Sequence, residues 1–93
     1  MIQNNSYFDD KVKSLGYDSE TSKSTVGVME PGDYEFGTST HETMIVIEGE
    51  LQVILPGETE KKSYKNGEIF QVEANQSFKV TSVGQTSYLC KYQ

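Results

Sequence analysis

The sequence is poor in positive charge. It contains no arginine: its eight basic residues are all lysines, set against 14 aspartates and glutamates, which gives a net charge of −6. Proteins that bind nucleic acid need a face rich in lysine and arginine to neutralise phosphates, and these lysines are too few and too scattered to form one. The composition therefore argues against nucleic acid as a partner.

Long apolar runs and cysteine pairs are absent as well. No stretch approaches the roughly 18 consecutive apolar residues of a membrane span, and the N-terminal MIQNNSYFDDKVK lacks the apolar core of a signal peptide. The one cysteine, Cys90, cannot form a disulfide within the chain, which is typical of a reducing compartment. We therefore expect no membrane partner and a cytoplasmic location.

Helical periodicity is missing from the whole chain. Short runs rich in Val, Ile, Tyr, Phe and Thr recur instead, separated by turn signals such as Asn66-Gly67. With no helix to cover a sheet, the strands have to close on themselves, so we expect one all-β domain over residues 1–93. The polar segment 18–24 between the first two strands is expected to be a mobile loop. The expected strands are Val12–Tyr17, Thr25–Glu30, Tyr34–Thr38, Glu42–Glu48, Leu51–Leu55, Lys61–Tyr64, Ile69–Glu73, Ser77–Val83 and Thr86–Tyr92.

The segment Glu42–Glu48 is unusual because both of its faces are apolar. Side chains alternate between the two sides of a strand, so Met44 and Val46 share one face while Ile45 and Ile47 share the other. A barrel of 93 residues has only one interior, and the second apolar face needs another cover. We therefore expect a homodimer.

Histidine is nearly absent too, and its position bears on metal binding. Glu42 followed after six residues by Gly49 resembles the end of the first motif of the cupin superfamily, G-x5-H-x-H-x3,4-E-x6-G. The motif's two histidine positions fall on residues without a ligating nitrogen: Phe36 and Thr38 or, at the longer spacing, Glu35 and Gly37. The only histidine, His41, is adjacent to Glu42 and would point to the opposite face of a strand. The resemblance implies a cupin-like barrel of the double-stranded β-helix or jelly-roll type, and we expect no metal, no cofactor and an exposed His41.

Without metal ligands, the same positions indicate a different kind of pocket. The second cupin motif, counted from Gly67, has Phe78 at its histidine position. Together with Phe36, Thr38 and Glu42, this residue would give an aromatic pocket with a single acid. Such a pocket suits a small organic ligand that combines a flat apolar part with hydroxyl groups.

Six stretches occur in a fixed order along nearly the whole chain: Asn5-Ser6-Tyr7-Phe8, Val12-Lys13-Ser14-Leu15-Gly16, Val26-Gly27-Val28-Met29, Pro31-Gly32-Asp33-Tyr34-Glu35-Phe36, Glu42-Thr43-Met44 and Ser87-Tyr88-Leu89-Cys90-Lys91-Tyr92. This series is similar to the small cupin-type pyrimidine/purine nucleoside phosphorylases. The resemblance implies reversible phosphorolysis of many nucleosides to ribose 1-phosphate and free base, without a metal. Members often carry arginine before the third stretch, where this chain has Lys23.

Phosphorolysis passes through a ribosyl centre with positive charge. Its site therefore has to bind phosphate, bind the ribose hydroxyls and hold the departing base. Glu42 is the candidate for binding the ribose hydroxyls and steadying charge at C1′, and Lys23 is the candidate for binding phosphate. Stacking on aromatic rings would hold the base and tolerate its identity, since every base has a π-face. The candidate substrate-binding residues beside Lys23 are Tyr34, Phe36, Thr38, Phe78, Tyr88 and Tyr92.

Each of these residues also has a structural interpretation. Glu42 could be a satisfied acid without a catalytic role, Lys23 a solvated lysine, and the aromatic residues plain core. The main competing function is a non-catalytic cupin that binds a small metabolite, since a fold alone does not imply a function. A metal-dependent cupin enzyme is disfavoured by the missing histidines, and a nucleophilic Cys90 by the lack of a histidine to activate it.

Overall fold

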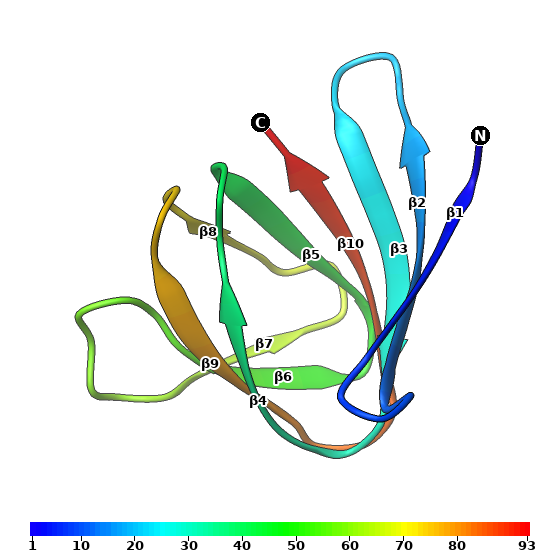
Figure 1. Cartoon of the computed structure of the whole chain (residues 1–93). Helices are drawn as coiled ribbons and strands as arrows, with labels where there is room; N and C mark the ends of the chain where they lie inside the picture. The colour runs from blue at the N-terminus through cyan, green and yellow to red at the C-terminus, as the bar shows by residue number, and fades with distance from the viewer.

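The whole chain folds into β-strands. The computed structural model describes residues 1–93 and contains ten strands with no helix between them (Figure 1). This confirms the expected all-β class. The strands are β1 (Gln3–Tyr7), β2 (Val12–Asp18), β3 (Lys23–Met29), β4 (Gly32–Gly37), β5 (Glu42–Glu48), β6 (Glu50–Ile54), β7 (Lys62–Lys65), β8 (Ile69–Val72), β9 (Ser77–Ser82) and β10 (Thr86–Tyr92).

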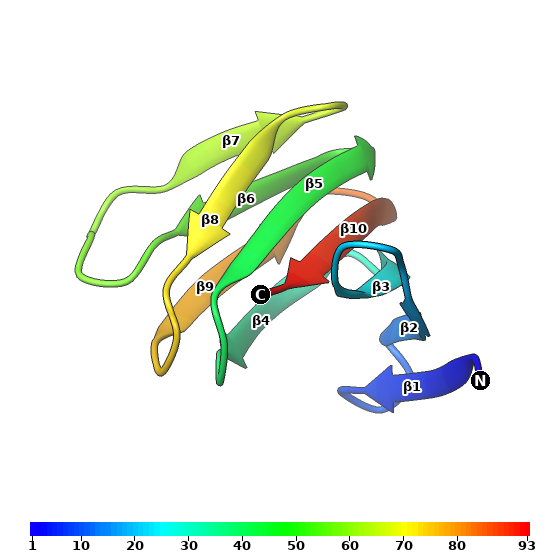
Figure 2. The same ribbon diagram turned by 90° about the horizontal axis from the view of Figure 1, so that it is seen from above.

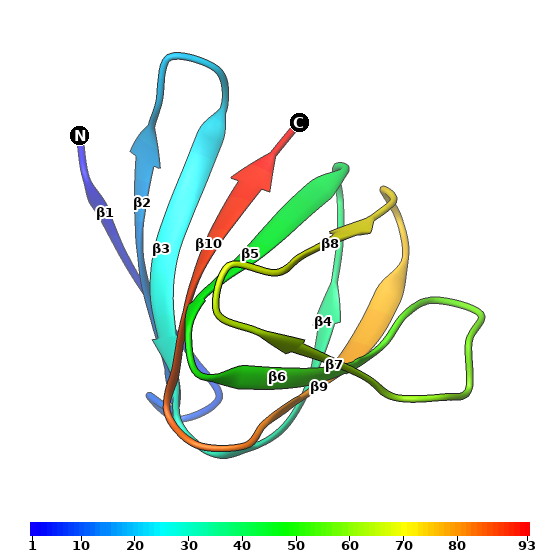
Figure 3. The same cartoon turned by 180° about the vertical axis from the view of Figure 1, so that it is seen from behind.

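The strands form two antiparallel sheets around one interior. The larger sheet has the order β1-β2-β3-β10-β5-β8, and the smaller one has the order β4-β9-β6-β7. Figures 2 and 3 show the two sheets facing each other, with β1 and β2 extending the larger sheet beyond the other strands. Alternate residues such as Val46, Leu51 and Val80 point inward and are almost completely buried. The space between the sheets is therefore apolar core in part, and the rest is free to form a site.

Strand β1 was not predicted from the sequence. Its residues are polar and mostly exposed, and it pairs only with β2, so it forms one edge of the larger sheet. An edge strand that covers no core carries no alternation of apolar and polar residues. Sequence patterning alone could not find it.

The prediction of a mobile loop over residues 18–24 is wrong. The β2–β3 ladder continues up to the pair Asp18↔Lys23, and only residues 19–22 form the hairpin turn. Ser19 holds that turn together, because its amide and hydroxyl both donate to the Ser22 carbonyl, at 2.8 Å each. Lys23 is consequently the first residue of β3, with a fixed cross-strand position, and not a residue of a loop.

Strand β5 has the two apolar faces that the sequence predicted. Met44 and Val46 are buried between the sheets, whereas Ile47 on the opposite face is 47% exposed. β5 and β10 begin and end at the expected residues, and the boundaries of the other predicted strands lie within two residues of the observed ones. None of the chain forms a helix with the length and apolarity needed to cross a membrane.

Candidate functional site

A cavity of about 400 Å³ lies between the two sheets, and we call it the chamber. Its wall from the larger sheet carries polar groups, which come from Ser14, Glu42, Tyr88, Cys90 and Tyr92. The facing wall, from β4 and β9, is aromatic: Phe36 and Phe78 are cross-strand partners with ring centroids 5.7 Å apart. A polar wall opposite an aromatic wall suits a ligand with a hydroxylated part and a flat part.

Three residues from three strands form one row across the larger sheet. Tyr92 of β10 is the direct partner of Glu42 in β5 and of Lys23 in β3. Directly opposed residues project to the same face, with Cβ atoms about 4.5 to 5.5 Å apart. Lys23 and Glu42 therefore lie on either side of Tyr92, on the face that lines the interior.

Glu42 is the only acid on the polar wall, and it is partly withdrawn from water. Burial raises the pKa of its carboxyl above the ordinary value, and a hydrogen bond from the Cys90 thiol lowers it in part. The Cys90 Sγ atom donates to Glu42 Oε1 at 3.5 Å. A carboxylate with few water partners interacts more strongly with a positive charge beside it than a solvated one does.

The Cys90 thiol acts as a hydrogen-bond donor and not as a nucleophile. The residue is buried, and both its burial and the neighbouring Glu42 carboxylate raise the pKa of the thiol well above its usual range. A reactive cysteine needs the opposite environment, one that stabilises the thiolate. The thiol instead fixes one carboxylate oxygen of Glu42.

Tyr88 lies deeper in the chamber and crosses the backbone of β3. Its cross-strand partner is Gly27, and burial is the main cause that raises the pKa of Tyr88 to about 12. A Cβ atom added at Gly27 would lie 2.5 Å from the Tyr88 hydroxyl oxygen. Gly27 is therefore required because the tyrosine ring occupies the space of its missing side chain.

The variant Gly27→Ala tests this packing. We expect it to lower the free energy of unfolding by roughly 1 to 3 kcal/mol, as other overpacked interiors do, because the added Cβ would displace the buried Tyr88 ring from its position against β3. Thermal unfolding followed by circular dichroism measures the change. Gly84→Ala is the matched control, since no atom lies within 4 Å of a Cβ at Gly84. Equal melting temperatures for the two variants would contradict the assigned contact.

Lys23 lines a second cavity, which adjoins the chamber. This cavity has a volume of about 320 Å³ and shares Ser39 and Tyr92 with the chamber. Lys23 is its only basic side chain, and the acid Asp18, its cross-strand partner in β2, lines the same cavity. Hydroxyl groups surround Lys23, including that of Thr25, which lies 3.1 Å from the Tyr92 hydroxyl. The chamber itself is lined by no lysine or histidine. The two cavities therefore differ in the charge they can accept.

Besides Lys23, which lines the second cavity, two of the predicted substrate-binding residues do not line the chamber. The Tyr34 hydroxyl donates to the Glu30 carbonyl at 2.7 Å. The Thr38 hydroxyl donates to the Glu73 carbonyl at 2.6 Å and accepts from the Gln76 amide at 3.0 Å. Both side chains are buried on the same face as Phe36, but their hydroxyls bond to the backbone and neither side chain reaches the chamber. Phe36, Phe78, Glu42, Tyr88 and Tyr92 do line the chamber.

The residues around Glu42 do not fit a metal ion. The structure has no group of three or more His, Cys, Asp or Glu side chains that could hold one. His41 lies just before β5, as expected, but it is half-buried and not exposed. Its Nδ1 atom is 3.5 Å from Glu73 Oε1, and its carbonyl accepts from the Gln93 amide at 2.8 Å. This histidine ties the C-terminal end of the chain to the barrel.

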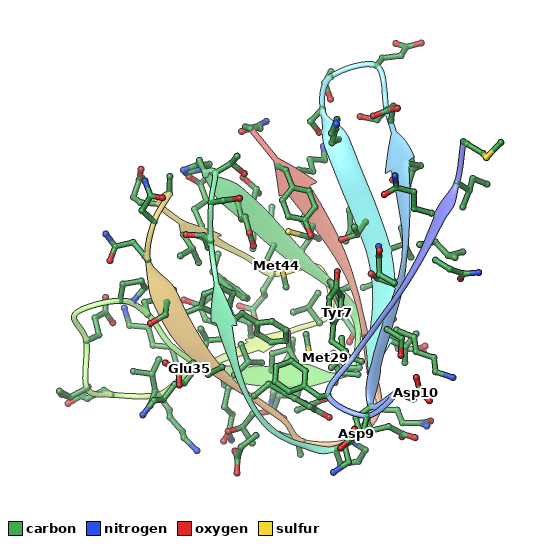
Figure 4. The ribbon with its side chains drawn as sticks, viewed as in Figure 1. Tyr7, Asp9, Asp10, Met29, Glu35 and Met44 are labelled. Carbon is green, nitrogen blue, oxygen red and sulfur yellow. The ribbon has the colours of Figure 1, made fainter.

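Several chamber residues were not predicted from the sequence. Figure 4 shows Tyr7, Met29 and Met44 around the same interior space, together with Glu35 at its margin. Tyr7 and Phe8 belong to β1 and the turn after it, which patterning could not detect. The available signal was the stretch Asn5-Ser6-Tyr7-Phe8, which is one of the six stretches on which the family resemblance rests.

Comparison with known proteins gives a consistent result. The model of the family "Pyrimidine/purine nucleoside phosphorylase" matches residues 2–92. A protein of that name from Alcanivorax borkumensis is 51% identical over 92 residues, covering 99% of this chain and 98% of its own. A crystal structure of a protein of unknown function from Vibrio parahaemolyticus is 45% identical with a TM-score of 0.96, covering 100% of this chain and 99% of that one.

A more distant neighbour extends the comparison to the fold. An RmlC-like cupin from Shewanella frigidimarina superposes with a TM-score of 0.77 at 14% identity, covering 98% of this chain and 82% of that one. At that identity the likeness concerns the fold, and it confirms the expected cupin-like barrel. Because the family model spans nearly the whole sequence and a full-length relative shares half of its residues, this chain belongs to the pyrimidine/purine nucleoside phosphorylase family.

Proposed function

We propose that this protein catalyses the reversible phosphorolysis of purine and pyrimidine nucleosides to ribose 1-phosphate and free base, without a cofactor. The reaction is a pentosyl transfer to phosphate, which makes the protein a glycosyltransferase. The observation that carries the proposal is the row Lys23–Tyr92–Glu42, which joins a cavity for an anion to a chamber for a nucleoside.

The proposed orientation of the nucleoside follows from the two walls of the chamber. The ribose hydroxyls bind at Glu42 on the polar wall, and the base lies against Phe36 and Phe78 on the aromatic wall. Stacking of this kind contributes roughly 1 to 3 kcal/mol per base and depends little on which base is present. Broad specificity for purines and pyrimidines follows from that tolerance.

The proposed position of phosphate follows from charge. Both acids that line the chamber, Glu35 and Glu42, repel a phosphate dianion, and the chamber has no cation to offset them. The adjoining cavity has one acid, Asp18, but it also has Lys23 and hydroxyls that can donate to phosphate oxygens. Phosphate at Lys23 would approach C1′ past the side chain of Tyr92.

The proposed reaction uses these groups and one proton, which the leaving base takes from water. A phosphate oxygen forms a bond to C1′ while the bond between C1′ and the base nitrogen breaks, and the base leaves with the bonding electron pair and takes up a proton. Positive charge develops on the ribose ring between the two partial bonds. The Glu42 carboxylate, held by Cys90 and partly shielded from water, stabilises that charge more in the transition state than in the bound substrate.

The proposal is tested by incubating the purified protein with uridine and with adenosine, each with and without phosphate, and measuring free base. We expect free uracil and adenine only when phosphate is present. A protein that binds both nucleosides but releases no base at any phosphate concentration would be the non-catalytic cupin instead. Full activity after dialysis against a metal chelator is the expected result for a site without a metal.

A second copy of this chain is the proposed partner. The outer face of the larger sheet carries an apolar row that crosses five adjacent strands, with each member paired to the next. Contiguous apolar surface of this kind is rare on monomers and is typical of protein interfaces. The row consists of Leu15, Val26, Leu89, Ile45 and Ile69. This row supports a homodimer. The free, buried Cys90 supports a location in the cytoplasm, where thiols stay reduced.

The variant Val26→Lys tests the proposed dimer. Val26 is 39% exposed within the row, so the isolated chain can fold with a lysine at this position. In a face-to-face dimer the same lysine would bury an unpaired charge. We expect sedimentation at micromolar concentration to give a dimer for the original protein and a folded monomer for the variant. Val83→Lys is the control, because Val83 is 54% exposed in the turn before β10, outside the row. A monomeric original protein would refute the dimer.

A further inference from the structure

The turn after β1 has a rare backbone conformation. Phe8, Asp9 and Asp10 have φ angles of 53°, 54° and 67°, so three consecutive residues other than glycine adopt the left-handed region. This conformation costs roughly 1 to 2 kcal/mol per residue, somewhat less for aspartate. Strained backbone of this kind persists only where surrounding contacts hold it, and it is concentrated at functional sites.

Two hydrogen bonds hold the backbone of the turn around Phe8. The Ser6 hydroxyl donates to the Asp10 carboxylate, and the Lys11 amide donates to the Phe8 carbonyl at 3.1 Å. Figure 4 shows Asp9 and Asp10 at the periphery of the molecule, below the chamber. The turn thus points its acids outward and its aromatic residue toward β4.

Phe8 joins the end of the larger sheet to the aromatic wall of the smaller one. Its ring meets Tyr34 edge-on at a centroid distance of 5.1 Å and Phe36 at 5.5 Å. Phe36 in turn lies 5.7 Å from Phe78, so Phe8 extends the aromatic wall by one ring. These contacts leave 43% of Phe8 exposed, and the residue lines the chamber.

The register of the strands puts Phe8 at the opposite end of the chamber from Glu42. Tyr7, which precedes it, is the cross-strand partner of Val12. Val12 is in turn the partner of Met29, and Met29 is the partner of Thr86 at the start of β10. Glu42 pairs with Tyr92 at the end of β10, which lies roughly 20 Å further along that strand at about 3.3 Å per residue. In the proposed orientation the base lies against Phe36, whose ring is 5.5 Å from that of Phe8, so the base is on the Phe8 side of the chamber.

We propose that Phe8 determines how strongly purines are preferred over pyrimidines. The inference rests on the proposed orientation of the nucleoside in the chamber. The two-ring purine reaches the exposed part of the Phe8 ring, whereas the one-ring pyrimidine ends at Phe36 and Phe78. Because Tyr34 and Phe36 already hold the ring before substrate binds, stacking on it loses little side-chain freedom.

The test compares Phe8→Ala and Phe8→Tyr with the original protein. For Phe8→Ala we expect the dissociation constant of adenosine, measured by calorimetry without phosphate, to rise about tenfold through loss of one stacking contact. The constant for uridine should change less than about threefold. Phe8→Tyr keeps the aromatic face and should restore adenosine binding. Steady-state KM values for the two nucleosides should follow the same pattern.

The controls separate this inference from folding and from the proposed reaction. Phe8→Leu keeps most of the volume without a π-face and should show the same selective loss if Phe8→Ala does not fold. Asp9→Gly lies in the same turn, does not line the chamber and suits its left-handed φ, so it should bind both nucleosides normally. Equal losses for adenosine and uridine, or none, would overturn the inference. If Phe8→Ala loses adenosine binding selectively but the original protein never releases base, the proposed phosphorylase activity would be refuted and the role of Phe8 would stand.

Discussion

Replacing Glu42 by glutamine is expected to lower the turnover of uridine at least about tenfold, equivalent to roughly 1.4 kcal/mol of transition-state stabilisation. Glutamine keeps the shape of the side chain and can still accept the hydrogen bond from Cys90, so the change removes only the negative charge. That charge is needed when the ribose ring becomes positive. Initial rates at saturating uridine and phosphate measure the effect.

The same variant should not lose stability. Burial raises the pKa of Glu42 in the folded protein, so the folded state binds this proton more tightly than the unfolded chain does. Ionisation of Glu42 therefore lowers stability as the pH rises through the interval between the unfolded and folded pKa values. At neutral pH, Glu42→Gln should melt at the same temperature as the original protein or at a higher one. Below the ordinary glutamate pKa of 4.5, the difference should vanish.

A matched control for this prediction lies on the same strand. Glu48 projects from the same side of β5 as Glu42 but is exposed and does not line the chamber. Glu48→Gln should leave the turnover of uridine unchanged. Reduced stability with full turnover in Glu42→Gln would return Glu42 to its structural interpretation.

Replacing Lys23 by alanine is expected to raise the apparent KM for phosphate about ten- to a hundredfold while leaving that for uridine nearly unchanged. Loss of one hydrogen bond to a charged group costs roughly 1.5 to 3 kcal/mol. In a protein with a net charge of −6, a local cation is also needed to offset the repulsion of a dianion. The measurement varies phosphate at saturating uridine, and then uridine at saturating phosphate.

Lys65→Ala is the control for general electrostatics. It removes the same charge from an exposed position in β7, in the opposite sheet from Lys23. If the effect of Lys23 arises from net charge alone, both variants should raise the KM for phosphate equally. Equal effects of Lys23→Ala on phosphate and on uridine would remove Lys23 from the phosphate site.

The local pattern of the sequence determined most of the fold. Short runs rich in Val, Ile, Tyr, Phe and Thr predicted nine of the ten strands, including β5 and β10, which carry Glu42 and Cys90. This works because the side-chain period of a strand is a local property. The missing histidines likewise excluded the cupin metal site from motif spacing alone.

Strand patterning did not predict which inward-facing side chains reach the chamber. Tyr34 and Thr38 alternate correctly with Phe36, yet their hydroxyls bond to backbone carbonyls and only Phe36 reaches the chamber. An inward position fixes the face of a sheet but not whether a neighbouring segment satisfies the polar group there. That depends on residues distant in sequence, such as Glu73 in the case of Thr38.

The composition of the site was decided by strand pairing and by one turn. Residues 23, 42 and 92 are far apart in the sequence, and only the register of β10 against β3 and β5 makes Lys23 and Glu42 neighbours of Tyr92. Tyr7 and Phe8 reach the chamber through a polar edge strand and a left-handed turn without an apolar pattern. The sequence by itself therefore determined the barrel, the missing metal ligands and the family, because these depend on local periodicity and motif spacing. The tertiary structure alone decided which side chains meet, because register and turn conformation are set by long-range contacts.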